Sequence, residues 1–233
     1  MGSLNLNDLT ILESVGETGI VRDGLILHLD AGNKNSYPGI GTRVFDLSGK
    51  GNHGTFNGPI TWINVGGGTF SFNGSSTWIS TNLNIDANPN TLCGWFLCTN
   101  VGNGVGTAVV CNDNGGWDKG WGITANQWEI HVGDNVAYSS TNVPVNNRWY
   151  FGCITYSTSN VILYINESQV YAKGSGTGAT SGASAEIGRA NYNAGAGSRW
   201  WPGYISNVQV YNKILTTGEI TQNYNAAKWR YNL

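Results

Sequence analysis

Residues 91–99 read TLCGWFLCT, a stretch dominated by aromatic, aliphatic and β-branched side chains and without a charged residue. Such a composition is typical of a β-strand, and residues 149–157 and 203–211 repeat it. Further segments of this kind predict strands at 24–30, 69–72, 78–80, 107–111, 121–125, 128–132, 161–165, 169–172 and 185–188. About a dozen closely spaced strands predict an all-β domain made of two packed antiparallel sheets.

The overall composition agrees with many short strands joined by turns and excludes some classes of protein. The 233 residues include 34 glycines, 10 tryptophans and 11 tyrosines, and they are long enough for one sizeable core. Only 11% of the residues are charged, and the net charge is −2. Nucleic-acid binding needs clustered Lys and Arg, so no nucleic-acid partner is expected. No apolar run approaches the roughly 20 residues of a membrane span, so no membrane partner is expected either.

One short helix is predicted near the C-terminus. Thr216 and Glu219 have the spacing of a capping box, in which each side chain binds a free amide of the first helical turn. Ile220, Tyr224 and Ala227 then recur at helical spacing. This pattern predicts a helix over residues 218–225.

Residues 1–22 differ from the rest of the chain and are interpreted as an N-terminal arm, followed by one sandwich domain over residues 23–233. The arm is too short for a core of its own but too apolar for a plain solvated tail. It has neither a basic start nor a continuous apolar stretch, so no secretion signal is expected. Its candidate partner-binding residues are Leu4, Leu6, Leu9, Ile11 and Leu12.

The four cysteines are Cys93, Cys98, Cys111 and Cys153. An even number allows two disulfides, although Cys93 and Cys98 lie on one predicted strand with Cα atoms about 16 Å apart, too far to bond. No CxxC pair is present, which argues against a zinc site. We expect four reduced, mostly buried cysteines that pack as small apolar residues.

Several segments, taken in order, resemble the laminin G-like family. They are GLILHLD at 24–30, DLSGKGNHGT at 46–55, FSFNG at 70–74, TLCGWF at 91–96, NRWY at 147–150, VILYIN at 161–166 and PGYISNVQVYNKIL at 202–215. The resemblance covers roughly residues 23–228 and implies a concanavalin A-like jelly roll, a two-sheet antiparallel sandwich. It says little about function, because sandwiches of this kind host many binding roles.

The chain departs from the family where metal binding or catalysis would be expected. Family members often bind calcium through a loop resembling Asp-Gly-x-x-Asp, but residues 73–77 read NGSST. A structural calcium ion therefore remains only as an alternative through other carboxylates, and otherwise no cofactor or metal is expected. The residues considered for that alternative are Asp30, Asp46, Asp113 and Asp118.

A glucanase on this fold would need two carboxylates flanking the bond it cleaves. The candidate strand, residues 128–134, offers only Glu129 and, in the following turn, Asp134, which are interpreted as a surface charge pair. His28, His53 and His131 are far apart in sequence and are interpreted as ordinary polar or packed histidines. No catalytic residue is assigned, and the chain is predicted not to be an enzyme.

Loop aromatics are the candidates for a sugar-binding platform. Trp117 and Asp118 lie among amides and glycines, and Trp200 and Trp201 form an adjacent pair. Neighbouring strand residues point to opposite sides of a sheet, so one tryptophan of this pair is expected to be buried and the other exposed. The alternative is that these aromatics are core, interface or loop anchors.

Two functional hypotheses remain. The first is a structural virion component of a tailed phage, a capsid decoration or fibre protein that is made in the host cytoplasm. It would dock on a capsid protein, another virion protein or copies of itself through the arm, since extended segments bind by backbone hydrogen bonds. The resemblance supports this reading, because laminin G-like domains are familiar from phage structural proteins. The alternative is a lectin-like module for carbohydrate, which is compatible with the first if the virion protein also binds a host surface glycan.

Overall fold

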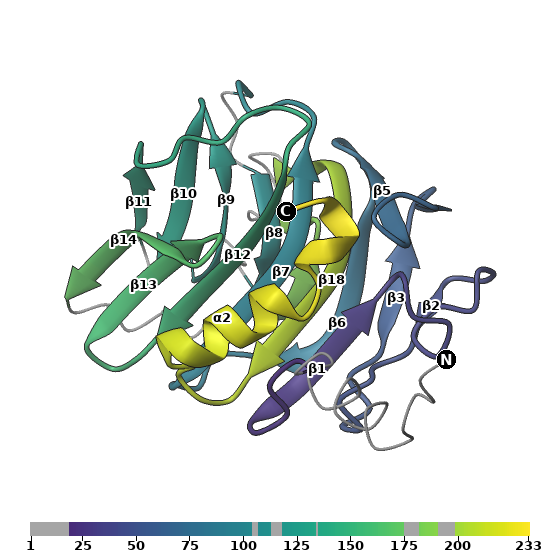
Figure 1. The fold of residues 1–233 in the computed structure, drawn as a ribbon, viewed down its shortest axis with the longest axis horizontal. Helices are drawn as coiled ribbons and strands as arrows, with labels where there is room; N and C mark the ends of the chain where they lie inside the picture. The colour runs from purple at the N-terminus through teal and green to yellow at the C-terminus, as the bar shows by residue number, and fades with distance from the viewer. Residues whose placement is uncertain (1–18, 104–106, 113–117, 134, 175–181, 191–198) are drawn as a thin grey trace, which may run out of the picture.

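The computed structural model describes residues 19–103, 107–112, 118–133, 135–174, 182–190 and 199–233. The arm residues Leu4, Leu6, Leu9, Ile11 and Leu12 lie outside this part of the chain. Two large antiparallel sheets pack face to face, which confirms the predicted sandwich (Figure 1). Their inner sides meet in one apolar core that includes Phe96, Trp121 and Trp201.

Sheet A holds the strand predicted from residues 91–99 at its centre. In spatial order it contains β14 (Ser168–Gly174), β13 (Asn160–Ile165), β12 (Trp149–Tyr156), β7 (Asn90–Cys98), β18 (Pro202–Tyr211), β5 (Thr69–Asn73) and β4 (Thr61–Ile63). The strand β1 (Leu25–Asp30) also pairs with β18. Every residue of β7 is buried, because the core covers one side of this strand and the C-terminal segment covers the other.

Sheet B forms the second layer. In spatial order it contains β11 (Val136–Ser139), β10 (Gln127–Val132), β9 (Lys119–Thr124), β8 (Thr107–Cys111), β15 (Ser184–Ile187), β6 (Trp78–Asn84), β3 (Gly54–Asn57) and β2 (Arg43–Val44). A small separate pair consists of β16 (Arg189–Ala190) and β17 (Arg199–Trp200). The sequence pattern missed β2, β3, β4, β11, β16 and β17, because they are too short or too polar to show strand periodicity.

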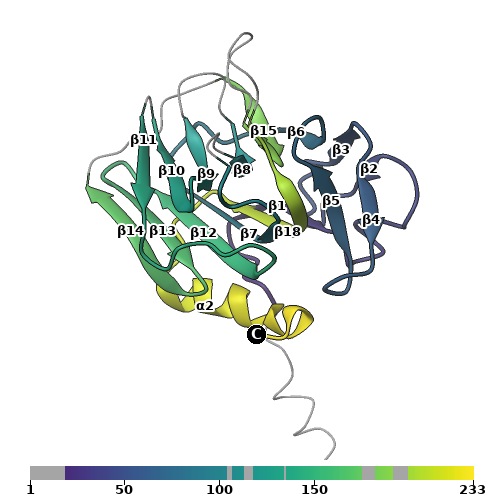
Figure 2. The same ribbon diagram turned by 90° about the horizontal axis from the view of Figure 1, so that it is seen from above.

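The predicted helix is confirmed as α2 (Thr217–Asn225), and a 3₁₀ helix η1 (Lys228–Tyr231) follows it. The capping box is complete: Thr216 Oγ1 accepts from the Glu219 amide at 3.2 Å, and the Glu219 carboxylate accepts from the Thr216 amide at 2.8 Å. Both helices lie across the outer side of sheet A (Figure 2). Trp95 there stacks on Tyr231, with ring centroids 4.3 Å apart.

The expectation of four reduced cysteines is wrong for one pair. Cys93 of β7 and Cys153 of β12 form a disulfide, with Cα atoms 4.1 Å apart. They lie directly opposite each other in the strand register, although 60 positions separate them in the sequence. Cys98 and Cys111 are buried and outside this disulfide.

Candidate functional site

The outer side of sheet B differs from its inner side. Along β6, Ile79, Thr81 and Leu83 point into the core and are buried, so the alternating residues Trp78 and Ser80 point outward. Helix α2 lies on the far side of the sandwich and leaves this surface uncovered (Figure 2). We call it the polar face and define it by the outward residues Thr55, Asn57, Trp78, Ser80, Asn82, Asn84, Cys111, Glu129, His131 and Glu186, together with Arg189, Arg199 and Trp200 of the β16–β17 hairpin.

The β16–β17 hairpin is fixed to the polar face by two ion pairs. Arg189 Nε donates to Glu186 Oε2 at 2.7 Å, and a second guanidinium nitrogen binds the other carboxylate oxygen. Arg199 Nη1 donates to Glu129 Oε1 at 2.6 Å. Glu186 and Glu129 belong to β15 and β10, with two strands between them, so the two ion pairs anchor the hairpin over that half of the sheet.

Arg189 and Trp200 of the hairpin form a stack with Trp78 of β6. The Arg189 guanidinium lies 3.9 Å from the Trp78 ring centroid and 5.4 Å from that of Trp200. The centroids of Trp78 and Trp200 are 5.4 Å apart, and both side chains are half-buried. Guanidinium–ring contacts hold the indoles in place, so part of each ring remains available on a rigid support.

A hydrogen-bonded chain of three buried side chains continues the polar face across β10 and β8. His131 Nε2 lies 3.1 Å from Glu129 Oε1, and His131 Nδ1 lies 3.3 Å from Cys111 Sγ. Ala190 of the hairpin packs on Cys111. The interpretation of Glu129 as part of a surface charge pair is therefore wrong: only 1% of its surface is exposed, because the hairpin covers it. Asp134 lies outside the described residues.

The predicted sugar-binding residues fall into different environments. Trp200 contributes to the stack, as the alternation between neighbouring residues predicted. Trp201 is fully buried and meets Phe96 edge to face at 5.4 Å, so its assignment as a glycan contact is wrong. Asp118 is only 2% exposed, so its side chain is not on the surface as a glycan contact would require. Trp117 lies outside the described residues. The sequence did not identify Trp78 or Arg189 as site residues. Both contact Trp200 because the β16–β17 hairpin places Arg189 and Trp200 next to β6.

The carboxylates considered for calcium make other contacts. Asp30 binds Arg230 Nη1 at 2.9 Å, and Asp46 accepts from the backbone amides of His28 and Ser48 at 2.9 Å each. These amides and the Ser48 hydroxyl lower the pKa of Asp46 against the opposing effect of burial. Asp113 lies outside the described residues. In the described part of the chain, no group of three or more His, Cys, Asp or Glu could hold a metal ion.

A cage of oxygens near Asp118 holds a side chain of the protein itself. Lys119 is fully buried, and its Nζ donates to the Ile85 carbonyl at 2.7 Å, the Asp86 carbonyl at 2.8 Å and Asn88 Oδ1 at 2.9 Å. Burial lowers the pKa of Lys119 to about 8, against the opposing charges of Asp86 and Asp118. The ammonium group therefore satisfies oxygens that would otherwise be candidate cation ligands.

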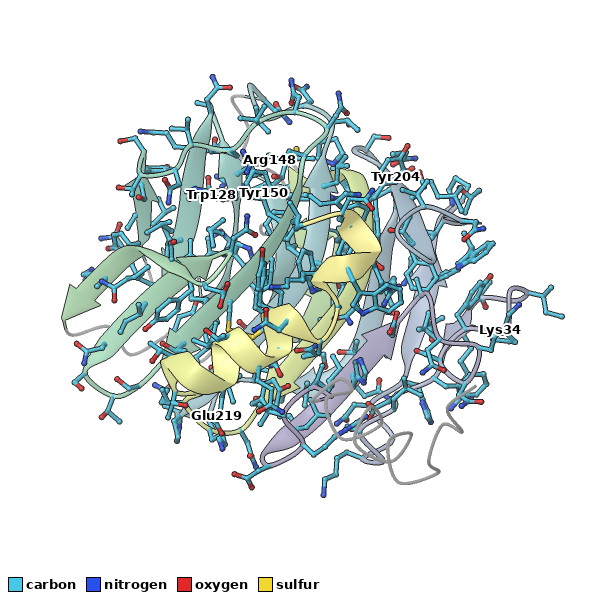
Figure 3. All side chains as sticks on the ribbon, in the orientation of Figure 1. Lys34, Trp128, Arg148, Tyr150, Tyr204 and Glu219 are labelled. Atoms are coloured by element: carbon cyan, nitrogen blue, oxygen red, sulfur yellow. A yellow bond between two sulfur atoms is a disulfide. The ribbon has the colours of Figure 1, made fainter. Side chains whose placement is uncertain are left out.

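A second candidate surface is an open hollow at the end of the sandwich, which we call the edge hollow. It has a volume of about 350 Å³ and is lined by residues including Asn142, Arg148 and Tyr150. The Arg148 guanidinium lies 5.4 Å from the Tyr150 ring centroid, and Tyr150 also meets Trp128 (Figure 3). Tyr150 is buried, and the lining combines polar side chains with the exposed Val143, so it offers no exposed aromatic ring for stacking.

Comparison with solved structures shows the same fold in toxin binding domains. One is the receptor binding domain of botulinum neurotoxin C/D mosaic serotype, with a TM-score of 0.64, 15% sequence identity and coverage of 88% of this chain and 52% of that chain. Another comes from botulinum neurotoxin type C, which needs an interaction with two ganglioside molecules to enter cells; it has a TM-score of 0.64, 16% identity and coverage of 89% and 52%.

A third is the binding domain of botulinum neurotoxin DC in complex with rat synaptotagmin II, with a TM-score of 0.63, 18% identity and coverage of 89% and 52%. The chain thus spans about half the length of these structures. At such low identity, the likeness concerns the fold alone.

Three further findings bear on the identity of the chain. No helix in the described residues has the length and apolar character needed to cross a membrane. No curated protein matches the sequence. A family model does match: Laminin_G_3, of the concanavalin A-like lectin/glucanases superfamily, covers residues 67–221, which is more than half of the chain. The chain therefore belongs to the laminin G-like branch of the concanavalin A-like lectin/glucanases superfamily.

Proposed function

We propose that this protein is a non-enzymatic binding module that holds carbohydrate on the polar face. The observation that carries the proposal is the half-buried pair Trp78 and Trp200, fixed by Arg189 beside strands whose outward residues are amides and hydroxyls. Sugar rings present apolar C–H surfaces and a rim of hydroxyls. Rigid aromatic rings next to a few well-placed polar groups suit such a ligand.

The carboxylates of the polar face support binding without hydrolysis. Glycoside hydrolysis uses one carboxyl group as an acid and another as a base or nucleophile. Glu186 and Glu129 are each bound to an arginine of the hairpin, and Glu129 is also hydrogen-bonded to His131. Both carboxylates therefore have structural partners in the hairpin, which favours a role in positioning the hairpin over acid catalysis.

The similar folds are compatible with the proposal. The toxin domains described above engage gangliosides in one case and a protein, synaptotagmin II, in another. This chain matches about half of each of those chains, and sandwiches of this kind host many binding roles. The aromatic stack favours a glycan for the polar face of this chain.

The test is isothermal titration calorimetry on glycans first selected from a glycan array. Trp200→Ala removes half of the aromatic pair and should weaken binding about tenfold or more, since stacking on an aromatic ring contributes about 1.5 kcal/mol. Trp229→Ala is the matched control, because Trp229 is 61% exposed on η1, on the opposite side of the sandwich. Equal losses in both variants, or a loss only in Arg148→Ala at the edge hollow, would contradict the placement on the polar face.

A second candidate function is assembly through the arm, including the role of a tailed-phage virion component. One observation favours it: the last residues of the predicted arm, 19–22, are held against α2. The Val21 amide donates to Asn223 Oδ1 at 2.8 Å, and Gln222 Nε2 donates to the Gly19 carbonyl at 2.6 Å. A partner bound by residues 1–18 would therefore be placed on the helix-covered side and would leave the polar face available.

Light scattering of the full chain and of a chain lacking residues 1–18 tests this second function. The deletion stops before Gly19, because Val21 is buried in the domain and its removal would damage the fold. A defined oligomer that becomes a monomer on deletion supports assembly through the arm. If both forms are monomers, self-association through the arm is excluded, and binding of the full chain to purified capsids becomes the test of a virion role.

A further inference from the structure

The charges of the polar face are balanced within the face itself. Arg189 is engaged by both oxygens of Glu186, and Arg199 by Glu129. The bidentate pairing occupies Nε and Nη2 of Arg189, a pair of nitrogens that could otherwise bind the carboxylate or sulfate of an acidic sugar, and Arg199 engages Glu129 through Nη1. Among the outward residues described, the remaining arginine is Arg43 on the edge strand β2, which is exposed, lies opposite Thr55 in the strand register and has its guanidinium 5.4 Å from the Phe45 ring.

Apart from Trp78, the outward side chains of β3 and β6 are polar without charge. They are Thr55, Asn57, Ser80, Asn82 and Asn84, which follow one another across the two paired strands. Asn57 Nδ2 donates to Ser80 Oγ at 2.9 Å, so two of them are already oriented by each other. Amides and hydroxyls both donate and accept hydrogen bonds, and this matches the hydroxyl groups of a neutral sugar.

Resting on the function proposed above, we infer that the polar face selects neutral oligosaccharides over sialylated, uronic or sulfated ones. A neutral pyranose can stack on Trp78 or Trp200 and hydrogen-bond to the amide and hydroxyl residues of β3 and β6. An acidic sugar in the same position meets Arg189 and Arg199 already bound to carboxylates, and its own charge lies beside Glu186. Gangliosides carry sialic acid, so this preference is opposite to that of the ganglioside-dependent toxin with the same fold.

The experiment compares acidic and neutral ligands that share one backbone. The first pair is tetragalacturonate and its fully methyl-esterified form; the second is lacto-N-tetraose with and without a terminal sialic acid. Calorimetry should give a neutral form that binds at least about fivefold more tightly than its acidic counterpart, a difference of about 1 kcal/mol. Equal or tighter binding of the acidic forms overturns the inference while the proposed function stands. If no neutral or acidic glycan of these pairs or of the array binds, the proposed function itself fails.

A variant tests the cause of the preference. Glu186→Gln removes the charge that occupies Arg189 and should move the ratio of acidic to neutral affinity toward the acidic ligand by about fivefold or more. Glu219→Gln makes the same change of charge at the start of α2, away from the polar face, and should leave the ratio as in the wild type. An unchanged ratio of acidic to neutral affinity in Glu186→Gln contradicts the charge-balance explanation. If this variant does not fold, the comparison of matched glycans on the wild-type protein still tests the preference itself.

Discussion

The outer sides of the two sheets present different chemistry. On sheet A, Trp95, Phe151 and Tyr211 pack beneath α2 and η1 in an aromatic and aliphatic cluster. On sheet B, the polar face carries two ion pairs, a buried Glu129–His131–Cys111 chain and amide-bearing strands. The outer residues of sheet A contribute a second core, whereas on sheet B the hairpin buries Glu129, His131 and Cys111 and leaves the polar outward residues of β3 and β6 available for binding. Substitutions on the two surfaces should separate stability from binding.

The largest expected effect lies on the helix-covered side. Trp95 is fully buried, stacks on Tyr231 and Tyr224 and meets the tilted ring of Phe151, with centroids between 4.3 and 5.4 Å away. Trp95→Ala should lower the free energy of unfolding by about 3–5 kcal/mol through lost burial and a cavity. Urea denaturation measures the loss, and glycan affinity at a temperature where the variant is folded should match the wild type. A loss below about 1 kcal/mol would show that the helices add little to the core.

Glu129→Gln tests whether the polar face also contributes to stability. The substitution keeps the shape but leaves the buried His131 without its anionic partner and Arg199 without its counter-charge. Breaking a buried pair in this way should cost about 3 kcal/mol in urea denaturation. The control is Asp23→Asn, which removes an 84% exposed partner of Lys213 and should leave the unfolding midpoint nearly unchanged. Similar midpoints for the two variants would contradict the burial of Glu129.

Acid should destabilise the molecule through a residue of sheet A. Burial lowers the pKa of His28 to about 4, with the charges of Asp30, Arg22, Asp46 and Arg230 modifying that effect. Within the described residues, its ring nitrogens have no hydrogen-bond partner. The unfolded chain binds a proton near pH 6.5 and the folded chain only near pH 4, so stability should fall by about 3 kcal/mol as the pH drops through this window. Urea midpoints from pH 7 to pH 4 measure the effect.

In the same titration, His28→Phe should flatten the pH dependence between pH 6.5 and pH 4. A slope equal to that of the wild type would assign the acid sensitivity to other groups. The neighbouring carboxylate Asp46 also titrates in acid. Because its pKa in the folded chain is lowered, the stability that Asp46 contributes is lost only below pH 3.8, its ordinary pKa, and so outside this window.

The smallest effect is expected at the cap of the helix. Thr216→Ala removes the side-chain acceptor of the Glu219 amide and one side of the capping box. The loss in free energy of unfolding should be about 1 kcal/mol, and Thr216→Ser should restore most of it. Thermal denaturation of the two variants side by side is sufficient. A variant Thr216→Ala as stable as the wild type would mean that packing of Ile220 and Tyr231 alone holds α2 and η1 in place.

The strands and the helix could be predicted from the sequence because their signals are local. The run at residues 91–99 became β7, and the Thr216–Glu219 spacing marked the start of α2. The alternation of Trp200 and Trp201 also predicted one buried and one exposed ring; Trp201 is buried, and Trp200 is half-buried.

The site depended on pairings between distant strands, which a single sequence does not encode locally. The disulfide needs the register between β7 and β12, and Glu129 is buried only because the β16–β17 hairpin brings Arg199 over it. Trp78 and Trp200 meet across more than a hundred residues for the same reason. The residues of the polar face could therefore be identified only once the hairpin was placed.

The most direct test of carbohydrate binding on the polar face is a nuclear magnetic resonance titration of the tryptophan indole N–H signals with a neutral oligosaccharide selected by the array. Separate tryptophans report on separate surfaces: Trp78 and Trp200 on the polar face, Trp128 at the edge hollow, where its Nε1 donates to the Asn142 carbonyl, and Trp229 on η1. Shifts of the Trp78 and Trp200 signals, with those of Trp128 and Trp229 unmoved, are the predicted result. Shifts confined to Trp128 or Trp229 would place the ligand elsewhere and contradict the account.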